Sequence, residues 1–299
     1  MSKTNLMKKV KPAIFAILAC FILLGLTSCN YSLYKTWNNY KDYTAGNGDF
    51  DATTVSSIAI DWVNGDINVV TADVEKITVF EQSARELKES ELLRYYLSDG
   101  VLDIKFVAPR LKLLDKKVLD KDLFIQIPLS AAASLSSLNI DSVNSDINVK
   151  NIKALDLEMD VVSGKIDIKN CTIVMLDIES VSDEINLLSS KIASIDISCV
   201  STNIKVNSEV TDFEVDTTSG NVDFTSTIMS NKIKINAISS VVNLTLPENS
   251  GFTVEYDTLS GQFTSDFATT NSNDKYIFGD GTKQIEVSTI SGNLSILKL

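Results

Sequence analysis

Histidine is absent from this chain of 299 residues. Its absence removes the commonest general acid-base group, the Ser-His-Asp and Cys-His pairings and most zinc sites. Basic residues are also scarce, because 27 Lys and Arg stand against 39 Asp and Glu, a formal net charge of -12. A surface that follows nucleic-acid phosphates needs clustered Lys and Arg. We therefore predict a protein that is not an enzyme, has no catalytic residues and no cofactor, and binds no nucleic acid.

Long apolar runs are missing too, except for one of 14 residues at positions 13–26. A membrane-spanning helix needs roughly 20 apolar residues, so a short run behind a lysine-rich start is typical of an export signal. The run ends in Leu26-Thr27-Ser28-Cys29, which resembles the bacterial lipobox. That resemblance implies that Cys29 is diacylated and anchors the mature chain in a membrane. An uncleaved anchor helix is the alternative, and both interpretations place the body outside the cytoplasm, in the cell envelope.

Only two cysteines, Cys171 and Cys199, lie beyond the lipobox. They occupy non-equivalent positions in the repeat described next, so we expect two separate thiols. Cys199 falls where small inward-facing residues recur, which favours a place in the core.

A short motif recurs along most of the chain: an alternating apolar run, a corner of the Val-Ser-Gly type, and a second alternating run. The corner positions are Gly65, Ser145, Gly164, Asp183, Thr202, Gly220, Ser240, Gly261 and Gly292. From Ser145 onward the steps are 19, 19, 19, 18, 20, 21 and 31 residues. Alternation with a period of two predicts strands, and so short a unit buries its apolar side only by stacking. We therefore predict an all-β, parallel β-helix-like β-solenoid with coils of about nineteen residues.

Two insertions interrupt the predicted stack. The first lies between the corners at Gly65 and Ser145, at about residues 77–135, and contains three candidate strands. The second is the final 31-residue step, in which Phe278–Gly281 favours a hairpin turn. The predicted organisation is a signal peptide at 1–28, a membrane tether at 29–50 and the solenoid domain at 51–299.

The bacterial putative-adhesin family of β-strand-repeat proteins, which has no established activity, resembles this chain in two features. One is the Val-Ser-Gly-x-Ile repeat, and the other is the ending, YIFGDG over residues 276–281 and IEVSTISG over 285–292. The similarity covers roughly residues 55 to 299 and implies a β-strand-repeat architecture with an adhesin-like role. The chain departs from the pattern where Asp183, Thr202 and Ser240 replace the corner glycine, which leaves the turn geometry there open.

The first strand of each coil carries carboxylates on its outward side. Aligned coils place Leu157, Leu176, Ile195 and Phe213 inward, so the alternating neighbours face outward. The predicted acidic face consists of Glu158, Asp160, Asp177, Glu179, Asp196, Glu214 and Asp216. Lys234 and Asn236 interrupt the face, and Glu255 and Asp257, then Glu286, resume it.

Neighbouring carboxylates about 5 Å apart repel by about 0.8 kcal/mol in water. A ligand that relieves this repulsion would be a cation such as Ca²⁺, a cationic peptide or a polymer, and the face is also a candidate site for a protein or a glycan. The alternative is a solvated acidic surface that keeps the protein soluble and prevents edge association. The sequence contains no Asp-x-Asn-x-Asp-Gly loop to enclose calcium.

Three functional hypotheses follow. The first is a non-enzymatic, adhesin-like binding or scaffold module displayed from a lipid tether at the cell envelope. The second is an accessory protein in envelope stress sensing or signalling, which contacts a membrane partner. The third is a carbohydrate-active β-helix enzyme, for which the acidic face supplies paired carboxylates but only one basic neighbour, Lys234.

Overall fold

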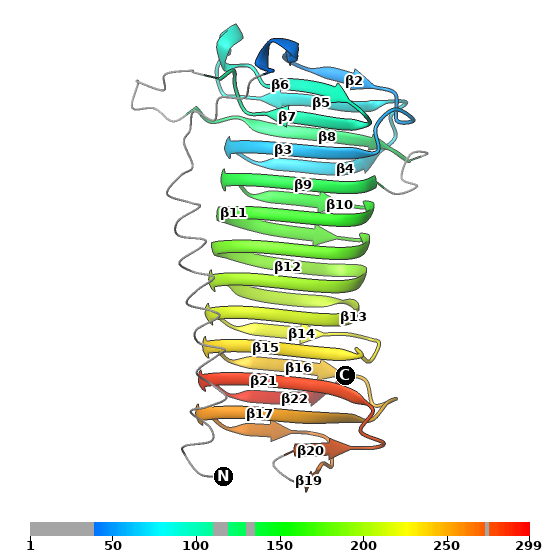
Figure 1. The fold of residues 1–299 in the computed structure, drawn as a ribbon, viewed down its shortest axis with the longest axis vertical. Coiled ribbons are helices and arrows are strands. Elements are labelled where there is room, and N and C mark those ends of the chain that lie inside the picture. The colour runs from blue at the N-terminus through cyan, green and yellow to red at the C-terminus, as the bar shows by residue number, and fades with distance from the viewer. Residues whose placement is uncertain (1–38, 110–118, 130–134, 273–274) are drawn as a thin grey trace. The chain divides into compact units, whose positions relative to one another are not determined.

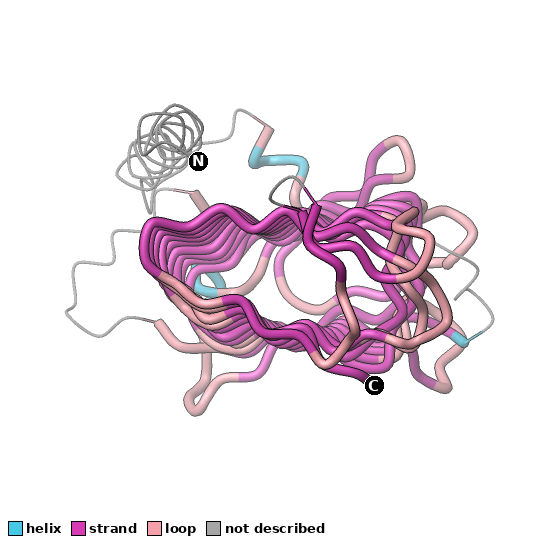
Figure 2. The backbone as a smooth tube through the Cα atoms, turned by 90° about the horizontal axis from the view of Figure 1, so that it is seen from below, coloured by secondary structure: helices cyan, strands magenta, loops and turns pink. Residues whose placement is uncertain are grey.

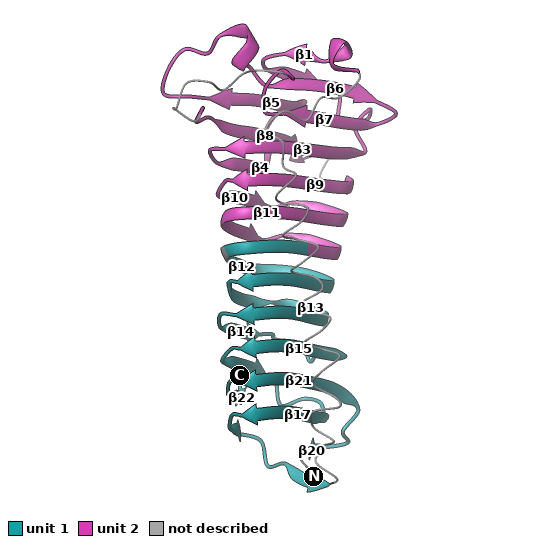
Figure 3. Ribbon diagram, turned by 60° about the vertical axis from the view of Figure 1, so that its left-hand side comes forward, with its two compact units in different colours: residues 1–26, 178–299 teal, residues 27–177 magenta. Residues whose placement is uncertain are grey.

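The computed structural model describes residues 39–109, 119–129, 135–272 and 275–299 (Figure 1). Their regular structure consists of β-strands and two 3₁₀ helices, which confirms the all-β prediction. The described residues form two compact units, of which unit 2 ends at Asp177 and unit 1 comprises residues 178–299 (Figure 3). The part of the chain that the structure describes holds no helix with the length and apolar character needed to cross a membrane.

Unit 2 holds the first half of the repeat and the segments that cover its end. Its elements are η1 (Tyr40–Asp42), β1 (Thr44–Ala45), β2 (Gly48–Phe50), β3 (Ser57–Asn64), β4 (Ile67–Ala72), β5 (Ile77–Gln82), η2 (Glu89–Glu91), β6 (Arg94–Ser98), β7 (Val101–Lys105), β8 (Asp122–Pro128), β9 (Leu135–Asn144), β10 (Ile147–Lys150) and β11 (Lys153–Lys169). The following strand, β12 (Thr172–Ser201), begins in unit 2 and continues into unit 1.

Unit 1 holds the second half of the repeat. Its remaining elements are β13 (Asn203–Ser219), β14 (Val222–Thr225), β15 (Lys232–Ser239), β16 (Val242–Leu246), β17 (Phe252–Ser260), β18 (Phe263–Ser265), β19 (Thr270–Ser272), β20 (Lys275–Phe278), β21 (Lys283–Ser291) and β22 (Leu294–Lys298). Seen end-on, strands of successive coils overlie one another (Figure 2). In each coil, face A denotes the strand segment before the corner residue, and face B denotes the strand segment after it. A long strand such as β11 contributes to both faces.

Parallel pairing stacks the coils of unit 2. Ile147 pairs with Ile166, nineteen residues later, and on its other side with Ile67, eighty residues earlier. The coil with the Gly65 corner therefore contacts the coil with the Ser145 corner directly. The segment that joins these two coils along the chain lies on the outer side of the first coil, where β7 pairs with β3 and β8 pairs with β4.

Antiparallel strands cover the outer end of unit 2. β5 pairs with β8, β6 pairs with β7, and the short strands β2 and β1 pair with β5 and β6. Residues 44–50 therefore belong to this cap, although the sequence assigns them to the tether. The Phe50 ring packs edge-to-face on Tyr95 at 5.0 Å between centroids. Strands β7 and β8 form the outermost coil. Because the antiparallel strands cover it, its inward residues, such as Leu102 and Ile104 on β7, are fully buried.

The stacking order in unit 1 differs from the order along the chain. β21 lies between β15 and β17 on face A, and β22 lies between β16 and β18 on face B. The chain therefore passes beyond one coil position, forms β17 to β20, and returns to fill that position. Simple chain order, which the sequence repeat suggests, is wrong for the last two coils.

Rows of aliphatic side chains fill the interior of each unit. In unit 2, Ile58, Leu138 and Leu157 are in register and fully buried. Each such side chain contributes about 1.5–3 kcal/mol when it leaves water. Cys171 and Cys199 are also buried, each within its own unit, in agreement with the interior position expected for Cys199.

Corner glycines are required where one coil stacks closely on the next. Gly164 has φ +135°, and a Cβ there would lie 2.0 Å from the carbonyl oxygen of Ser145. Gly220, with φ +114°, approaches the carbonyl of Thr202 in the same way. The non-glycine corners Ser145 and Thr202 bury their own side chains, and each stacks against one of these two glycine corners.

Candidate binding face

The outward side of face A in unit 2 carries the first part of the predicted acidic face. Glu158, Asp160 and Asp177 are all exposed. β11 pairs with β9 so that Asp160 lies opposite Asp141, and β9 pairs with β3 so that Asp141 lies opposite Asp61. The row of carboxylates thus extends beyond the residues predicted from the sequence, to Asp141 and Asp61.

The extended row ends at a lysine. Lys105 on β7 lies opposite Asp61 and forms ion pairs with Asp61 and, at 2.7 Å, with Asp103. Burial opposes the charge of Lys105, but its hydrogen bonds to Asp103 and Asp61 raise its pKa. The Tyr43 hydroxyl donates to Asp103 as well, which connects η1 to this end of the row.

The carboxylates on β11 and at the start of β12 have no lysine comparable to Lys105 among the described residues. Across the described ranges, no lysine or arginine forms an ion pair with Glu158, Asp160 or Asp177. Although the three residues are exposed, the protein atoms around each carboxylate partly desolvate it and so raise its pKa, and neighbouring carboxylates add to the effect for Glu158 and Asp177. The Asn139 amide donates to Glu158 at 3.3 Å. These three residues, which we call the acidic triplet, therefore form a local concentration of negative charge in unit 2.

Unit 1 carries the other predicted residues of the face, and their environment differs. Glu179 and Asp196 are exposed, whereas Glu214 and Asp216 are half-buried. Glu214 lies between Asp196 and Lys234 in the strand register and forms an ion pair with Lys234.

The cations beside Glu214 change its acidity. Burial alone would raise its pKa, but Lys234 and Lys232 outweigh burial and lower it. Asn236 donates to Asp216 at 2.7 Å. Lys234 and Asn236 therefore satisfy the carboxylates next to them and do more than interrupt the row.

The strand order corrects the predicted course of the acidic face beyond Lys234. Glu286 lies directly opposite Lys234, and Glu255 lies on the far side of Glu286. The sequence order, with Glu255 before Glu286, is the reverse of the spatial order. Lys275 on β20 forms an ion pair with Glu255.

Two further predictions concern a metal and the lipid. In the described part of the chain, no three carboxylate or thiol groups converge on a site that could hold a metal ion. Cys29 lies outside the described residues, as does the signal segment 1–28.

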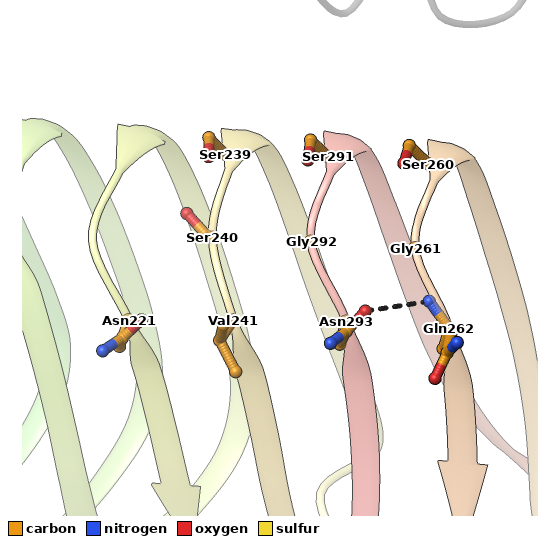
Figure 4. A pocket seen from close by; sticks show the side chains of 10 residues that line it. All are labelled: Asn221, Ser239, Ser240, Val241, Ser260, Gly261, Gln262, Ser291, Gly292 and Asn293. Atoms are coloured by element: carbon orange, nitrogen blue, oxygen red, sulfur yellow. Dashed lines mark hydrogen bonds between the residues drawn. The ribbon is translucent and has the colours of Figure 1, made fainter.

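A groove of about 710 Å³ lies in unit 1, at the corners of neighbouring coils (Figure 4). Its lining residues are Asn221, Ser239, Ser240, Val241, Ser260, Gly261, Gln262, Ser291, Gly292 and Asn293. The Gln262 backbone N–H donates to the Asn293 side-chain oxygen at 3.0 Å. The lining offers hydroxyl, amide and backbone groups to a ligand but no charged side chain.

The cap of unit 2 contains a buried cation that the sequence does not reveal. The Lys121 ammonium lies between the Trp62 and Phe106 rings, 5.1 Å and 4.7 Å from their centroids. It donates to Glu81 and, at 2.7 Å, to the carbonyl of Glu91. Burial lowers the pKa of Lys121 to about 8, against the opposing effect of Glu81. A single lysine just before a predicted strand gives no sequence signal of this role.

Comparison with known proteins places this architecture in a family. The Toastrack DUF4097 family model matches residues 55–297. This chain belongs to the Toastrack DUF4097 family. The match confirms the family resemblance in the repeats and in the ending of the sequence. No curated protein matches the chain.

Three solved structures are similar to this Toastrack chain. A "putative cell adhesion protein" from Clostridium sporogenes is 11% identical, with 86% of this chain and 100% of that chain covered and a TM-score of 0.26. A "putative adhesin" from Bacteroides fragilis is 12% identical, with 84% and 97% covered and a TM-score of 0.49. A "putative lipid binding protein" from Parabacteroides distasonis is 13% identical, with 88% and 98% covered and a TM-score of 0.46.

Proposed function

We propose that this Toastrack protein is a non-enzymatic binding module, held at the cell envelope by a lipid on Cys29. Its coils of about nineteen residues, with two insertions, serve as a rigid support for outward-facing side chains. The ligand is polycationic, a basic protein segment or a positively charged polymer, and it binds the acidic triplet. Small metal ions are secondary, because the described carboxylates do not converge on one point.

One observation carries the proposal. The acidic triplet has raised pKa values and no ion-pairing cation, whereas Glu214 in unit 1 has two lysines beside it. Repulsion within the triplet costs free energy that an incoming cationic ligand would recover. The interior offers no comparable opportunity, because its rows consist of tightly packed aliphatic side chains.

The test is binding of a fluorescent oligolysine peptide to the mature chain, followed by anisotropy at low and at physiological salt. Glu158→Gln, Asp160→Asn and Asp177→Asn are combined in one variant. Three partly screened charge interactions of about 0.5 kcal/mol each predict roughly tenfold weaker binding. Added salt is expected to weaken binding to the native chain in the same direction.

A matched control separates the triplet from net charge. Asp73→Asn, Glu75→Gln and Glu86→Gln change the net charge equally and replace exposed carboxylates elsewhere in unit 2. The control variant should bind as the native chain does. Equal weakening in both triple variants would show non-specific attraction to an acidic protein and would contradict a site at the triplet.

The lipid anchor is tested independently. The full chain and its Cys29→Ser variant are expressed in a bacterium with a lipoprotein pathway, and membrane and soluble fractions are compared. We expect acyl labelling and membrane recovery for the full chain and loss of both for the variant. Unchanged membrane recovery without acyl labelling would indicate an uncleaved anchor helix.

A further inference from the structure

The terminal coil of unit 1, formed by β17 and β18, has an open edge. β17 pairs along its whole length with β21 on one side, but β20 covers only residues 252–255 on the other side. β18 pairs with β22 on one side, and no strand among the described residues pairs with its other side. Among the described strands, none pairs with the outer edge of residues 256–260 and 263–265, so their backbone groups on that edge lack a strand partner.

The core is also incompletely covered at this coil. Tyr256 is in register with the buried Val287, and Phe263 is in register with the buried Leu294. Yet both aromatic residues are partly exposed. Their rings form a cluster with Tyr276, whose centroid lies 4.2 Å from that of Phe263. The cap of unit 2, in contrast, fully buries the inward residues of its outermost coil.

Open strand edges pair with other chains unless charge, proline or a covering segment prevents it. The exposed stretch contains no proline and one charged residue, Asp257. Leu259 is 54% exposed on the same strand. This edge thus combines backbone groups without a strand partner, partly exposed aromatic rings and an exposed leucine. Together they favour the binding of an additional strand at the edge.

We propose that this edge pairs with the same edge of a second copy of this chain, antiparallel and about a two-fold axis at Thr258. Such pairing places Asp257 of one copy opposite Leu259 of the other, and Tyr256 opposite Ser260. No like charges then lie directly opposite each other. Thr258 of one copy lies opposite Thr258 of the other, and Thr–Thr pairs are favourable across antiparallel strands.

The geometry of the coil lets both faces pair at once. Thr258 and Thr264 are each three residues from the corner at Gly261, on opposite sides of the coil. A two-fold axis that passes near both residues pairs β17 with β17 and β18 with β18. β20 does not obstruct this arrangement. It covers only residues 252–255 of β17, and in the proposed register the second copy leaves this face at its own corner, after its residue 260 has paired with residue 256.

The paired segments are short, five residues on face A and three on face B. So small an interface belongs to the weak, transient class. Self-association is therefore expected only at protein concentrations of about 10 µM or more. This inference does not depend on the proposed ligand or on the lipid anchor.

The test is sedimentation velocity of the mature chain from about 5 to 500 µM. Leu259→Asp places two carboxylates opposite each other at two positions, and Leu259→Lys places opposite charges there. We expect the aspartate variant to weaken self-association at least fivefold and the lysine variant to strengthen it. Leu297→Asp and Leu297→Lys are controls, because Leu297 is also exposed but lies outside the proposed interface, on β22, where it pairs with Thr245 of β16.

Hydrogen exchange on the native chain provides a readout that needs no variant. Amides within residues 256–265 should gain protection as the concentration rises, and those of β16 should not change. A native chain that stays monomeric at 500 µM, or equal effects of aspartate and lysine at position 259, would overturn the proposal.

Discussion

The ammonium of Lys121 lies 2.5 Å from a carboxylate oxygen of Glu81, and both side chains are almost completely removed from solvent. The other oxygen of Glu81 accepts the backbone N–H of Leu93 at 2.8 Å. This pair joins β5 to the residue before β8 and to the segment before β6, so it stabilises the cap of unit 2 on the first coil. Trp62 reinforces the junction, because its indole N–H donates to the Lys121 carbonyl at 3.0 Å.

Removal of one partner of this pair should destabilise the protein strongly. Lys121→Met leaves the Glu81 carboxylate buried without its cation, which typically costs about 3–5 kcal/mol. The double variant Lys121→Met, Glu81→Gln should recover part of that loss, because the glutamine oxygen still accepts from Leu93. Urea denaturation of the three proteins checks both expectations, and a double variant no more stable than the single one would contradict them.

The same lysine predicts a pH dependence at alkaline pH. Its folded pKa of about 8 lies below the unfolded value of about 10.4, so the unfolded chain binds more protons between these values. The contribution of Lys121 to the free energy of unfolding should therefore rise from pH 8 to pH 10 and stay constant below pH 8. Lys121→Met should lack this rise. The difference between the two pH profiles is the measurement, because it cancels other titrating groups such as Tyr43.

Corner glycines provide a test of the stacking geometry. Gly164→Ala introduces a Cβ 2.0 Å from the Ser145 carbonyl oxygen at a positive φ, so we expect a loss above about 3 kcal/mol. Gly46→Ala is the matched control: its φ is +84°, but the nearest atom to the new Cβ lies 3.8 Å away. Strain alone should cost about 1–2 kcal/mol there. Equal losses at the two positions would show that close coil contact is not the reason for Gly164.

The two parts of the acidic face should respond oppositely to neutralisation. Glu158→Gln removes a carboxylate whose pKa is raised by burial and like charges, so stability at pH 7 should increase by a few tenths of a kcal/mol. Glu214→Gln removes the partner of Lys234, so stability should fall by about 0.5 kcal/mol. Thermal melting at low salt detects both changes. A decrease for Glu158→Gln would mean that its environment is not repulsive.

A calcium titration tests whether the acidic triplet is a metal site. Because the described carboxylates do not converge, millimolar Ca²⁺ should not raise the melting temperature beyond the effect of Mg²⁺ at equal ionic strength. A shift specific to calcium that disappears in the Asp160→Asn variant would point instead to a metal site at the acidic triplet.

Strand positions and side-chain orientation could be predicted because the repeat alternates with period two. Leu157 and Phe213 face inward, and Glu158 and Asp160 face outward, as that alternation requires. Asp141 lies one regular step of nineteen residues before Asp160, so the repeat alone could have extended the acidic row to it. Asp61 could not be predicted, because about sixty additional residues separate the first coil from the second along the chain but not in space.

Stacking order and buried polar contacts depend on tertiary packing that no local pattern records. The period of the repeat identifies a coil but not its place in the stack, so β21 between β15 and β17 had no sequence signal. Lys121 was overlooked for a related reason. A lysine is usually solvated, and this one is buried only because Glu81, Trp62 and Phe106 meet around it.

The central claim is that the acidic triplet binds a cationic partner at the cell envelope. Its most direct test is quantitative mass spectrometry of cell-envelope proteins and polymers captured by three mature baits: the native chain, the neutralised triplet variant, and the control variant with Asp73, Glu75 and Glu86 replaced. We predict a basic partner that the native and control baits recover and the triplet variant does not. Recovery of the same partners by all three baits would contradict the claim.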